Sequence, residues 1–459
     1  MIKVVQAYDG ALISEVPSDD ANALEAKLET ARRTFLNRDG WLAPHERIAI
    51  LHRLAELLAG KVDHFARLIA REGGKPLTDA KAEALRAVDG VRNGADELRN
   101  FAGREIPMGL TPASTRRMAF TVKEPIGVVA AISAFNHPLN LIVHQVVPAI
   151  AVGCPIIVKP ASSTPLCCLE FVALVRAAGL PEAWCQTFLP EHTALAEALV
   201  TDSRVAFLSF IGSAAVGWHL RSKLAPGTRC ALEHGGAAPV IVDRSADLDL
   251  TIPSLVKGGY YHAGQVCVST QRIYVHNAIK AEFVARFTKA VTALKVGDPT
   301  LPTTEVGPLI LPKEADRVMA WIEEAKAAGA EVTTGAQKLS ERVVSPTVLV
   351  EPPADVRVSR EEVFGPVTCI YGFDKVETAI QSANSLPLAF QASIYTQDLN
   401  FALQVAPRLD GSAVMINDHT AFRVDWMPFA GHRHSGYGIG GIPWTMREMT
   451  HEKMMVFKS

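Results

Sequence analysis

The chain has 459 residues, of which 48% are hydrophobic and 20% are charged. At about 100 to 200 residues per domain, this length predicts two or three domains, and the apolar content argues against a disordered chain. The 46 Lys and Arg residues against 48 Asp and Glu residues leave a formal charge of -2. That balance gives no basis for a nucleic-acid-binding surface or a polyacidic tail.

Targeting and metal signals are also missing from the sequence. The first residues show no charged segment followed by a long apolar run, so we expect no signal peptide. Prolines and asparagines interrupt the long uncharged run 125–158, which argues against a membrane helix. None of the seven cysteines belongs to a CxxC pair, so neither a disulfide framework nor a metal site is expected. We expect a cytoplasmic protein without membrane partners.

The first hundred residues are mostly helical by pattern. Apolar residues at helical spacing predict helices over 44–58, 62–71 and 79–101, and Gly73 with Gly74 ends the second of these. From Met118 onwards the chain becomes rich in β-branched and small residues, which is typical of strands.

Strands and helices then alternate along the chain. Strands are predicted over 128–132, 156–158, 185–189 and 205–210, with helices over 141–152, 167–178 and 192–200 between them. A second set comprises strands at 240–242, 272–276, near Val367 and near Ala392, and helices over 281–294 and 318–328. This alternation predicts α/β units built on largely parallel sheets with helices on both faces.

Two glycine patterns are candidates for a phosphate-binding loop. Gly436, Gly438 and Gly441 form a literal GxGxxG, but no strand precedes it and the chain ends before a ribose-binding acid could follow. We therefore interpret it as a flexible C-terminal turn. The turn 210–213 follows a predicted strand and opens a helical stretch, so its backbone N–H groups could meet a phosphate. Such a turn can also cap a helix for stability alone.

Six segments give the chain a family resemblance. They are Ala134-Phe135-Asn136-His137-Pro138-Leu139, Val158-Lys159-Pro160-Ala161, Phe210-Ile211-Gly212-Ser213 with Val216-Gly217, Leu232-Glu233-His234-Gly235-Gly236, Gly264-Gln265-Val266-Cys267, and Glu361-Glu362-Val363-Phe364-Gly365-Pro366. In this order they resemble the aldehyde dehydrogenase superfamily over nearly the whole chain. The resemblance is nearest to the lactaldehyde, semialdehyde and phosphonoacetaldehyde dehydrogenase branches.

The resemblance implies the oxidation of an aldehyde to an acid through a covalent thioester. Cys267 stands at the nucleophile position, and the Asn136 amide with the Cys267 backbone N–H would stabilise the oxyanion. Glu233 would activate the hydrolytic water. The resemblance implies that Lys159 is both a catalytic residue and a cofactor-binding residue. Read alone, Asn136 could be a helix cap and Glu233 a solvated surface residue.

Seven residues match the family's nicotinamide-cofactor positions. They are Lys159, Ser162, Gly212, Ser213, Val216, Glu362 and Phe364. Many NAD-preferring relatives carry a glutamate where this chain has Ser162, and a carboxylate there would repel the 2′-phosphate of NADP. Since Ser162 brings no positive charge either, NAD and NADP both stay open.

Substrate recognition is suggested by three basic residues. His137 follows the oxyanion asparagine, Arg423 lies in the C-terminal stretch that lines the substrate tunnel of relatives, and Arg92 is placed on the early helix near the same opening. Such a cluster suits a small aldehyde with a carboxylate, phosphonate, phosphate or sulfonate. The alternative is that both arginines are solvated or structural.

The resemblance also implies the architecture, an aldehyde dehydrogenase-like α/β fold. A Rossmann-type cofactor domain would span 1–102 and 126–234, a catalytic α/β domain 235–435, and a β oligomerisation arm 103–125 and 436–459. We expect a homodimer or homotetramer, since the β-prone 118–122 segment is a credible edge strand.

Two alternatives to simple aldehyde oxidation are a CoA-acylating dehydrogenase and a catalytically silent binding or structural member. Glu233 argues against the first, and the presence of Asn136, Glu233 and Cys267 together argues against the second.

Overall fold

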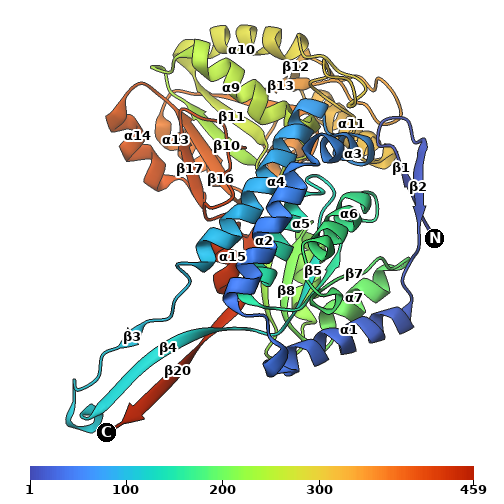
Figure 1. The fold of residues 1–459 in the computed structure, drawn as a ribbon. Coiled ribbons are helices and arrows are strands. Elements are labelled where there is room, and N and C mark those ends of the chain that lie inside the picture. The colour runs from blue at the N-terminus through green and yellow to red at the C-terminus, as the bar shows by residue number, and fades with distance from the viewer.

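The structure, a computed structural model, describes residues 1–459. It contains two α/β units, each built on its own β-sheet, and a projecting arm (Figure 1). The first sheet has the strand order β19-β9-β8-β5-β6-β7. Its parallel strands are β5 (Val128–Ile132), β6 (Ile156–Lys159), β7 (Cys185–Thr187), β8 (Val205–Ile211) and β9 (Arg229–Glu233), and β19 (Gly436–Tyr437) joins them antiparallel. The helices between them are α5 (Asn140–Val152), α6 (Leu166–Ala177), α7 (Thr193–Thr201) and α8 (Ala214–Ser222). The predicted alternation and the α/β fold class are confirmed.

Four helices precede this sheet. They are α1 (Ala21–Leu36), α2 (Pro44–Ala59), α3 (Val62–Gly73) and α4 (Leu77–Leu98). Gly74 ends α3 in the left-handed conformation, at φ 74°, as its position after the helical pattern suggests. The short hairpin of β1 (Ile2–Val5) and β2 (Leu12–Val16) was not predicted. Small residues on α4 let it approach α5 closely, because a Cβ on Gly94 would lie 2.4 Å from the Val147 side chain.

The second sheet has the strand order β12-β13-β14-β11-β10-β16-β17 and is parallel except for β12. Its strands are β10 (Ala238–Val242), β11 (Thr270–His276), β12 (Glu331–Thr334), β13 (Thr347–Val350), β14 (Val367–Phe373), β16 (Gln391–Tyr395) and β17 (Ala413–Ile416). Its helices are α9 (Leu248–Tyr260), α10 (Asn277–Thr292), α11 (Pro312–Ala327), α12 (Arg357–Arg360), α13 (Val376–Ala383) and α14 (Leu399–Val405). Each sheet has its own large apolar core.

Short elements complete the chain. They are the 3₁₀ helices η1 (Arg38–Gly40), η2 (Pro112–Ser114), η3 (Glu182–Trp184), η4 (Tyr261–Gly264) and η5 (Ala406–Arg408), and the paired strands β15 (Leu388–Ala389) and β18 (His432–Arg433). No helix is both long enough and apolar enough to span a membrane.

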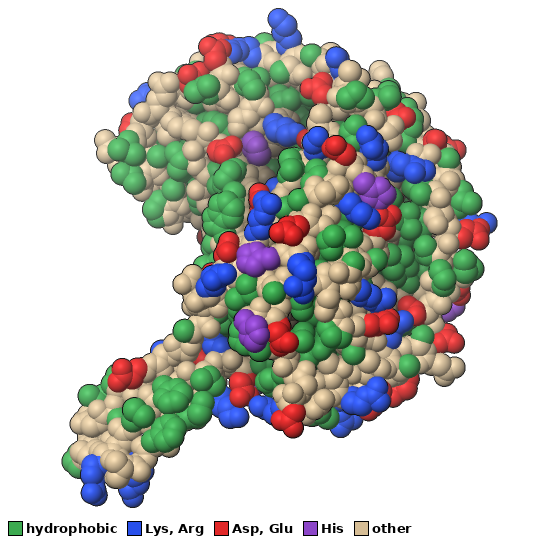
Figure 2. Space-filling view, in the orientation of Figure 1, with side chains coloured by type: hydrophobic (Ala, Val, Ile, Leu, Met, Phe, Trp, Pro, Cys, Tyr) green, Lys and Arg blue, Asp and Glu red, His purple; other side chains and the backbone are tan.

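The arm is an antiparallel sheet of β20 (Thr450–Lys458), β4 (Arg117–Pro125) and β3 (Glu105–Ile106), and it extends away from the body at the lower left of Figure 1. Hydrophobic side chains gather along it in Figure 2.

The predicted arm bounds need correction at the C-terminal side. Residues 436–449 do not lie in the arm sheet, because β19 pairs with β9 and α15 (Ile442–Glu448) packs on α4 and α5.

Candidate active site

One large pocket, with a volume of about 870 Å³, is lined by residues of both α/β units. The first unit contributes residues at or just after the carboxyl ends of β5, β6, β8 and β9. The second contributes the loops around Cys267, Glu362 and Arg423. A crevice beyond the carboxyl ends of parallel strands is the usual ligand site of open α/β sheets. No group of three or more His, Cys, Asp and Glu side chains is arranged to hold a metal ion.

Cys267 lies just after a strained turn. Within η4 the backbone of His262 and Ala263 is left-handed, at φ 49° and 54°. Gly264 continues the turn at φ +71°, where a Cβ would lie 2.1 Å from the Gly365 carbonyl oxygen. Only glycine fits this close approach. The turn therefore brings the segment that carries Cys267 directly beside the 361–366 segment.

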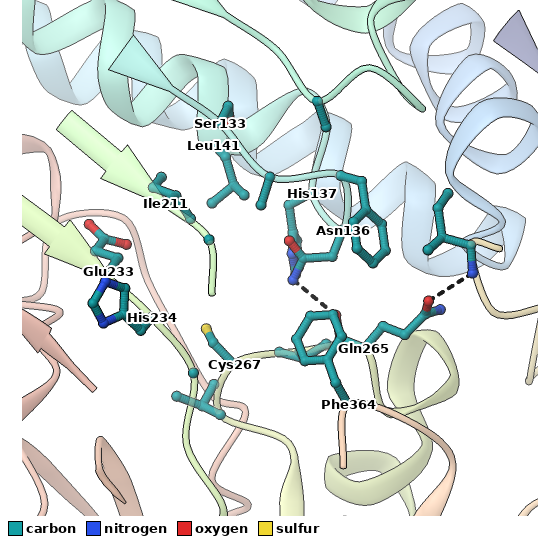
Figure 3. Close-up of a pocket in the computed structure, with 18 of the residues that line it drawn as sticks. Ser133, Asn136, His137, Leu141, Ile211, Glu233, His234, Gln265, Cys267 and Phe364 are labelled. Carbon is teal, nitrogen blue, oxygen red and sulfur yellow. Dashed lines mark hydrogen bonds between the residues drawn. The ribbon is translucent and has the colours of Figure 1, made fainter. Parts of the chain in front are cut away.

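Hydrogen bonds fix the same segment in place. The Gln265 side chain accepts from the Ile310 N–H at 3.0 Å and donates to the Pro308 carbonyl at 3.1 Å. The Cys267 carbonyl accepts from the Gly236 N–H at 3.0 Å. The sulfur projects into the pocket, between the strand of Glu233 and the loop of Asn136 in the view of Figure 3.

Cys267 differs from the other six cysteines, since they are buried and it is only partly buried. Burial raises the pKa of its thiol to about 12, Glu362 and Glu233 raise it as well, and the nearby Arg423 guanidinium opposes them. A thiolate is the nucleophilic form of cysteine. Arg423 thus supplies positive charge where a thiolate would form.

Asn136 lies in the loop after β5 and is 5% exposed. Its Nδ2 donates to the Gln265 carbonyl at 2.9 Å, a contact drawn as a dashed line in Figure 3. The structure thus brings Asn136 and the Cys267 loop together across the pocket. An amide donor beside a nucleophile can stabilise an oxyanion.

Glu233 is the last residue of β9 and faces the pocket. Burial raises the pKa of its carboxyl group, and Arg423 opposes the rise. The glycines near the C-terminus make room for it, because a Cβ on Gly440 would lie 1.9 Å from Glu233 Oε1. The interpretation of the 436–441 glycine pattern as a flexible turn is wrong, since Gly436 pairs with Glu233 in the first sheet.

His234, which follows Glu233, also lines the pocket. Its Nδ1 lies 2.9 Å from the His434 carbonyl oxygen, and this carbonyl also accepts from Trp218 Nε1 at 3.2 Å. The His234 Nε2 is buried without a hydrogen-bond partner. It packs closely against Gly217, because a Cβ on that glycine would lie only 2.0 Å from Nε2. The 232–236 motif of the sequence contains His234 but predicts no role for it.

Six of the seven predicted cofactor residues line the pocket: Lys159, Gly212, Ser213, Val216, Glu362 and Phe364. Ser162 does not, because it is exposed and its neighbours Ala161 and Ser163 line the pocket instead. The expectation for Ser162 followed a fixed spacing from Lys159. The chain turns after β6, and this turn directs residue 162 towards solvent.

The cofactor side carries polar groups without partners. Ser213 is the residue before α8, and its hydroxyl makes no capping hydrogen bond, which leaves it and the helix N-terminus available to a phosphate. Glu362 Oε1 is buried without a partner and lies so close to Gly235 that a Cβ there would be 1.7 Å away. Lys159 Nζ donates only to the Pro160 carbonyl, at 3.0 Å. Hydrogen-bond donors at the N-terminus of α8 fit the pyrophosphate of a dinucleotide, and the Glu362 carboxylate, as an acceptor, fits its ribose hydroxyls.

The substrate side differs from expectation at Arg92. His137 and Arg423 line the pocket, but Arg92 lies outside it, with its side chain 54% exposed and 3.2 Å from Asp89. Arg86, on the same helix α4, lines the pocket in its place. Six residues correspond to about 240° of helix rotation, so Arg86 and Arg92 face different ways. Glu83, three residues before Arg86 on the same helix, is also buried, but this burial is visible only in the structure and not in the sequence.

Arg423 sits against aromatic and polar neighbours. Its Cζ lies 3.6 Å from the centre of the Phe429 ring, and its Nη2 lies 3.3 Å from His144 Nδ1. Burial lowers the pKa of its guanidinium, while Glu233 and Asp425 raise it. The guanidinium stays charged in any accessible pH range, so the pocket holds a partly desolvated cation.

Comparisons with known proteins agree with this geometry. The model of the "Aldehyde dehydrogenase family" matches residues 1–455. The 3-sulfolactaldehyde dehydrogenase of Priestia aryabhattai is 37% identical over 447 residues, which cover 97% of this chain and 92% of that protein. The chain therefore belongs to the aldehyde dehydrogenase family, and the family and enzyme class predicted from the sequence are confirmed.

Solved structures show the same fold over the full chain. Aldehyde dehydrogenase 21 from Physcomitrella patens, in complex with its reaction product succinate, superposes with a TM-score of 0.96 at 32% identity and covers 100% of this chain and 95% of its own. A glyceraldehyde-3-phosphate dehydrogenase from Methanocaldococcus jannaschii complexed with NADP has a TM-score of 0.95 at 31% identity, with coverage of 100% and 99%.

Proposed function

We propose that this protein oxidises a small anionic aldehyde to its carboxylic acid with NAD or NADP, and that Cys267 is the nucleophile. The observation that carries the proposal is the convergence of Cys267, Asn136 and Glu233 on one pocket that also holds the N-terminus of α8. A nucleophile, an oxyanion donor and a base are the parts that acyl chemistry needs.

The proposed reaction has two stages, formation of a thioester on Cys267 and its hydrolysis. The Cys267 thiolate attacks the aldehyde carbon, a C–S bond forms, and the carbonyl oxygen takes the negative charge. The Asn136 amide and the Cys267 N–H then stabilise that oxygen, which requires Asn136 Nδ2 to exchange the Gln265 carbonyl for the substrate. When bound, a nicotinamide would accept the hydride that the adduct carbon releases as the C=O bond re-forms, which leaves a thioester on Cys267. In the second stage Glu233 takes a proton from water, the water oxygen attacks the thioester carbon, and the C–S bond breaks to restore Cys267.

The cofactor would be held by Ser213 and the α8 N-terminus at its phosphates, and by Glu362 at a ribose. Phe364 would pack beside the nicotinamide. NADP is supported by the relative from Methanocaldococcus jannaschii, which is complexed with it. No carboxylate lines the pocket at position 161, 162 or 163 to repel a 2′-phosphate.

The anionic class of substrate is supported by Arg86 and Arg423, both of which line the pocket. Guanidinium groups pair well with carboxylates and sulfonates. The similar protein from Priestia aryabhattai is named for a sulfonated aldehyde, and the structure from Physcomitrella patens holds succinate. The relatives give no support to a CoA-acylating or silent member. Glu233 argues against the first, and Asn136, Glu233 and Cys267 together argue against the second.

The test is the rate of reduced-nicotinamide formation with NAD and NADP in parallel, across anionic and neutral aldehydes of matched length. We expect the anionic member of each pair to have the higher kcat/KM. Arg86→Met and Arg423→Met should reduce that preference, whereas Arg92→Met, outside the pocket, serves as the matched control. Equal rates for anionic and neutral aldehydes would overturn the substrate class and leave the general activity.

The chemistry is tested by two further variants. Cys267→Ala should abolish oxidation while nucleotide still binds, and Glu233→Gln should let a thioester accumulate as a covalent adduct visible by mass spectrometry. Normal turnover by Glu233→Gln would mean that another base activates the water.

We propose a homodimer or homotetramer joined through the arm. The proposed domains are a cofactor domain over 1–102 and 126–234, a catalytic domain over 235–435, and an arm formed by 103–125 and 450–459. The exposed apolar side chains of β20 support assembly through the arm. A cytoplasmic location is supported by seven cysteines that are all free thiols.

A further inference from the structure

A single buried carboxylate connects the substrate-side residues. Asp425 is 2% exposed. Its Oδ1 accepts from Arg86 Nη2 at 2.7 Å and from Asn140 Nδ2 at 3.1 Å, and it lies 2.7 Å from His144 Nε2. These partners come from α4 and α5, so Asp425 joins two helices to the C-terminal segment that carries Arg423.

The hydrogen-bond chemistry determines which nitrogen of His144 carries the proton. Arg423 Nη2, 3.3 Å from His144 Nδ1, can only donate, so Nδ1 must accept. The proton of a neutral imidazole is then on Nε2, which donates to Asp425. Burial lowers the pKa of His144 to about 4, and Arg423 lowers it as well, so the neutral form holds at physiological pH.

The electrostatics of Asp425 fit the same arrangement. Burial alone would raise the pKa of Asp425, but His144, Arg86 and Arg423 hold it well below its ordinary value. Asp425 is therefore a permanent carboxylate that meets Arg86 directly and Arg423 through His144. Both guanidinium groups line the pocket, while their other sides are held by this chain of hydrogen bonds.

We propose that Asp425 and His144 are positioning residues that hold Arg86 and Arg423 as one preorganised receptor for the anionic group of the substrate. Neither residue lines the pocket, so both would act through the two arginines. A fixed pair of guanidinium groups binds a carboxylate or sulfonate better than two mobile ones, because less side-chain entropy is lost on binding. The inference rests on the anionic substrate class proposed above.

The test compares two aldehydes of the same chain length, succinic semialdehyde and butanal, in the full-length enzyme. Asp425→Asn removes the charge that holds Arg86, and His144→Phe removes both the donor and the acceptor. We expect each to raise the KM for succinic semialdehyde by about tenfold or more, with a much smaller change in kcat, because binding of the anionic group is lost. The ratio of kcat/KM values, anionic over neutral, should fall by a similar factor.

His144→Gln is the matched variant, since its amide offers an NH2 donor group and an oxygen acceptor. It should retain more of the anionic preference than His144→Phe. Inhibition by succinate gives a second readout without turnover, and its inhibition constant should rise in Asp425→Asn and His144→Phe. Thermal unfolding of each variant separates loss of folding from loss of recognition, and the two His144 variants keep the test valid if Asp425→Asn does not fold.

The outcomes separate the two proposals. A wild-type enzyme without preference for succinic semialdehyde would overturn the anionic substrate class itself. A wild-type preference that survives in Asp425→Asn and His144→Phe would overturn the positioning role alone. A lower KM in Asp425→Asn would also overturn it, since Asp425 would then act only by cancelling positive charge.

Discussion

Glu233 illustrates how one residue's surroundings determine when it can work. Burial raises the pKa of its carboxyl group, and the Arg423 charge opposes that rise. Only the ionised carboxylate can take a proton from water. As pH falls through the raised pKa, Glu233 is protonated and deacylation is lost, so the acidic limb of kcat should lie at higher pH than the value of about 4.3 for a solvated glutamate.

Arg423→Met should move this limb further towards high pH, because it removes the charge that favours the carboxylate. The measurement is the pH profile of kcat with a neutral aldehyde, so that loss of anion binding does not intervene. Arg92→Met is the control, since Arg92 pairs with Asp89 outside the pocket. A limb that stays in place in Arg423→Met would mean that the two groups do not interact during turnover.

Gly440 tests the position of the same carboxylate. A Cβ at residue 440 would lie 1.9 Å from Glu233 Oε1, so Gly440→Ala must displace one or the other. We expect kcat to fall by about tenfold or more, as small misplacements of catalytic groups cost that much, and the thioester to accumulate. Gly297→Ala is the matched control, because a Cβ there meets only Thr304 Oγ1 at 3.7 Å. Normal deacylation in Gly440→Ala would show that Glu233 has room to move.

At the scale of elements, the His434 carbonyl joins α8 to the end of β9. It accepts from Trp218 Nε1 on α8 and lies 2.9 Å from His234 Nδ1. His234→Leu removes one of these contacts and leaves the N-terminus of α8 less firmly placed against the cofactor. We expect the KM for NAD or NADP to rise by about threefold to tenfold, the cost of roughly one hydrogen bond, while kcat changes less.

Trp218→Phe should act in the same direction, because it removes the other donor to that carbonyl. His219→Leu is the control, since the His219 side chain is 51% exposed on the same helix. The measurement is the KM for the cofactor at saturating aldehyde, with cofactor binding followed separately by fluorescence. An unchanged cofactor KM in both His234→Leu and Trp218→Phe would assign this contact to stability alone.

At the scale of the whole molecule, local pattern predicted the two α/β units and most of the pocket. The strands 128–132 and 205–210 and the helices of the first sheet follow directly from apolar spacing. The ordered motifs singled out Cys267, Asn136 and Glu233, all of which line the pocket. What could not be predicted depends on which face of an element is buried. Arg86 was missed in favour of Arg92 because both lie on one helix, and Arg86 meets Asp425 across 339 residues of sequence.

The exposed edge of the arm leads to a prediction about the assembly of subunits. β20 lies at the edge of its three-stranded sheet, and Met454 and Val456, on the same face of this strand, are 54% and 48% exposed. An exposed edge with apolar side chains favours pairing with another chain. The double variant Met454→Glu with Val456→Glu should therefore shift the protein to a smaller species in light scattering after size exclusion. Lys458→Glu, at the end of the strand, is the control for added negative charge. If the double variant keeps the wild-type mass, the subunits associate through another surface, and the apolar face of β20 serves only the arm itself.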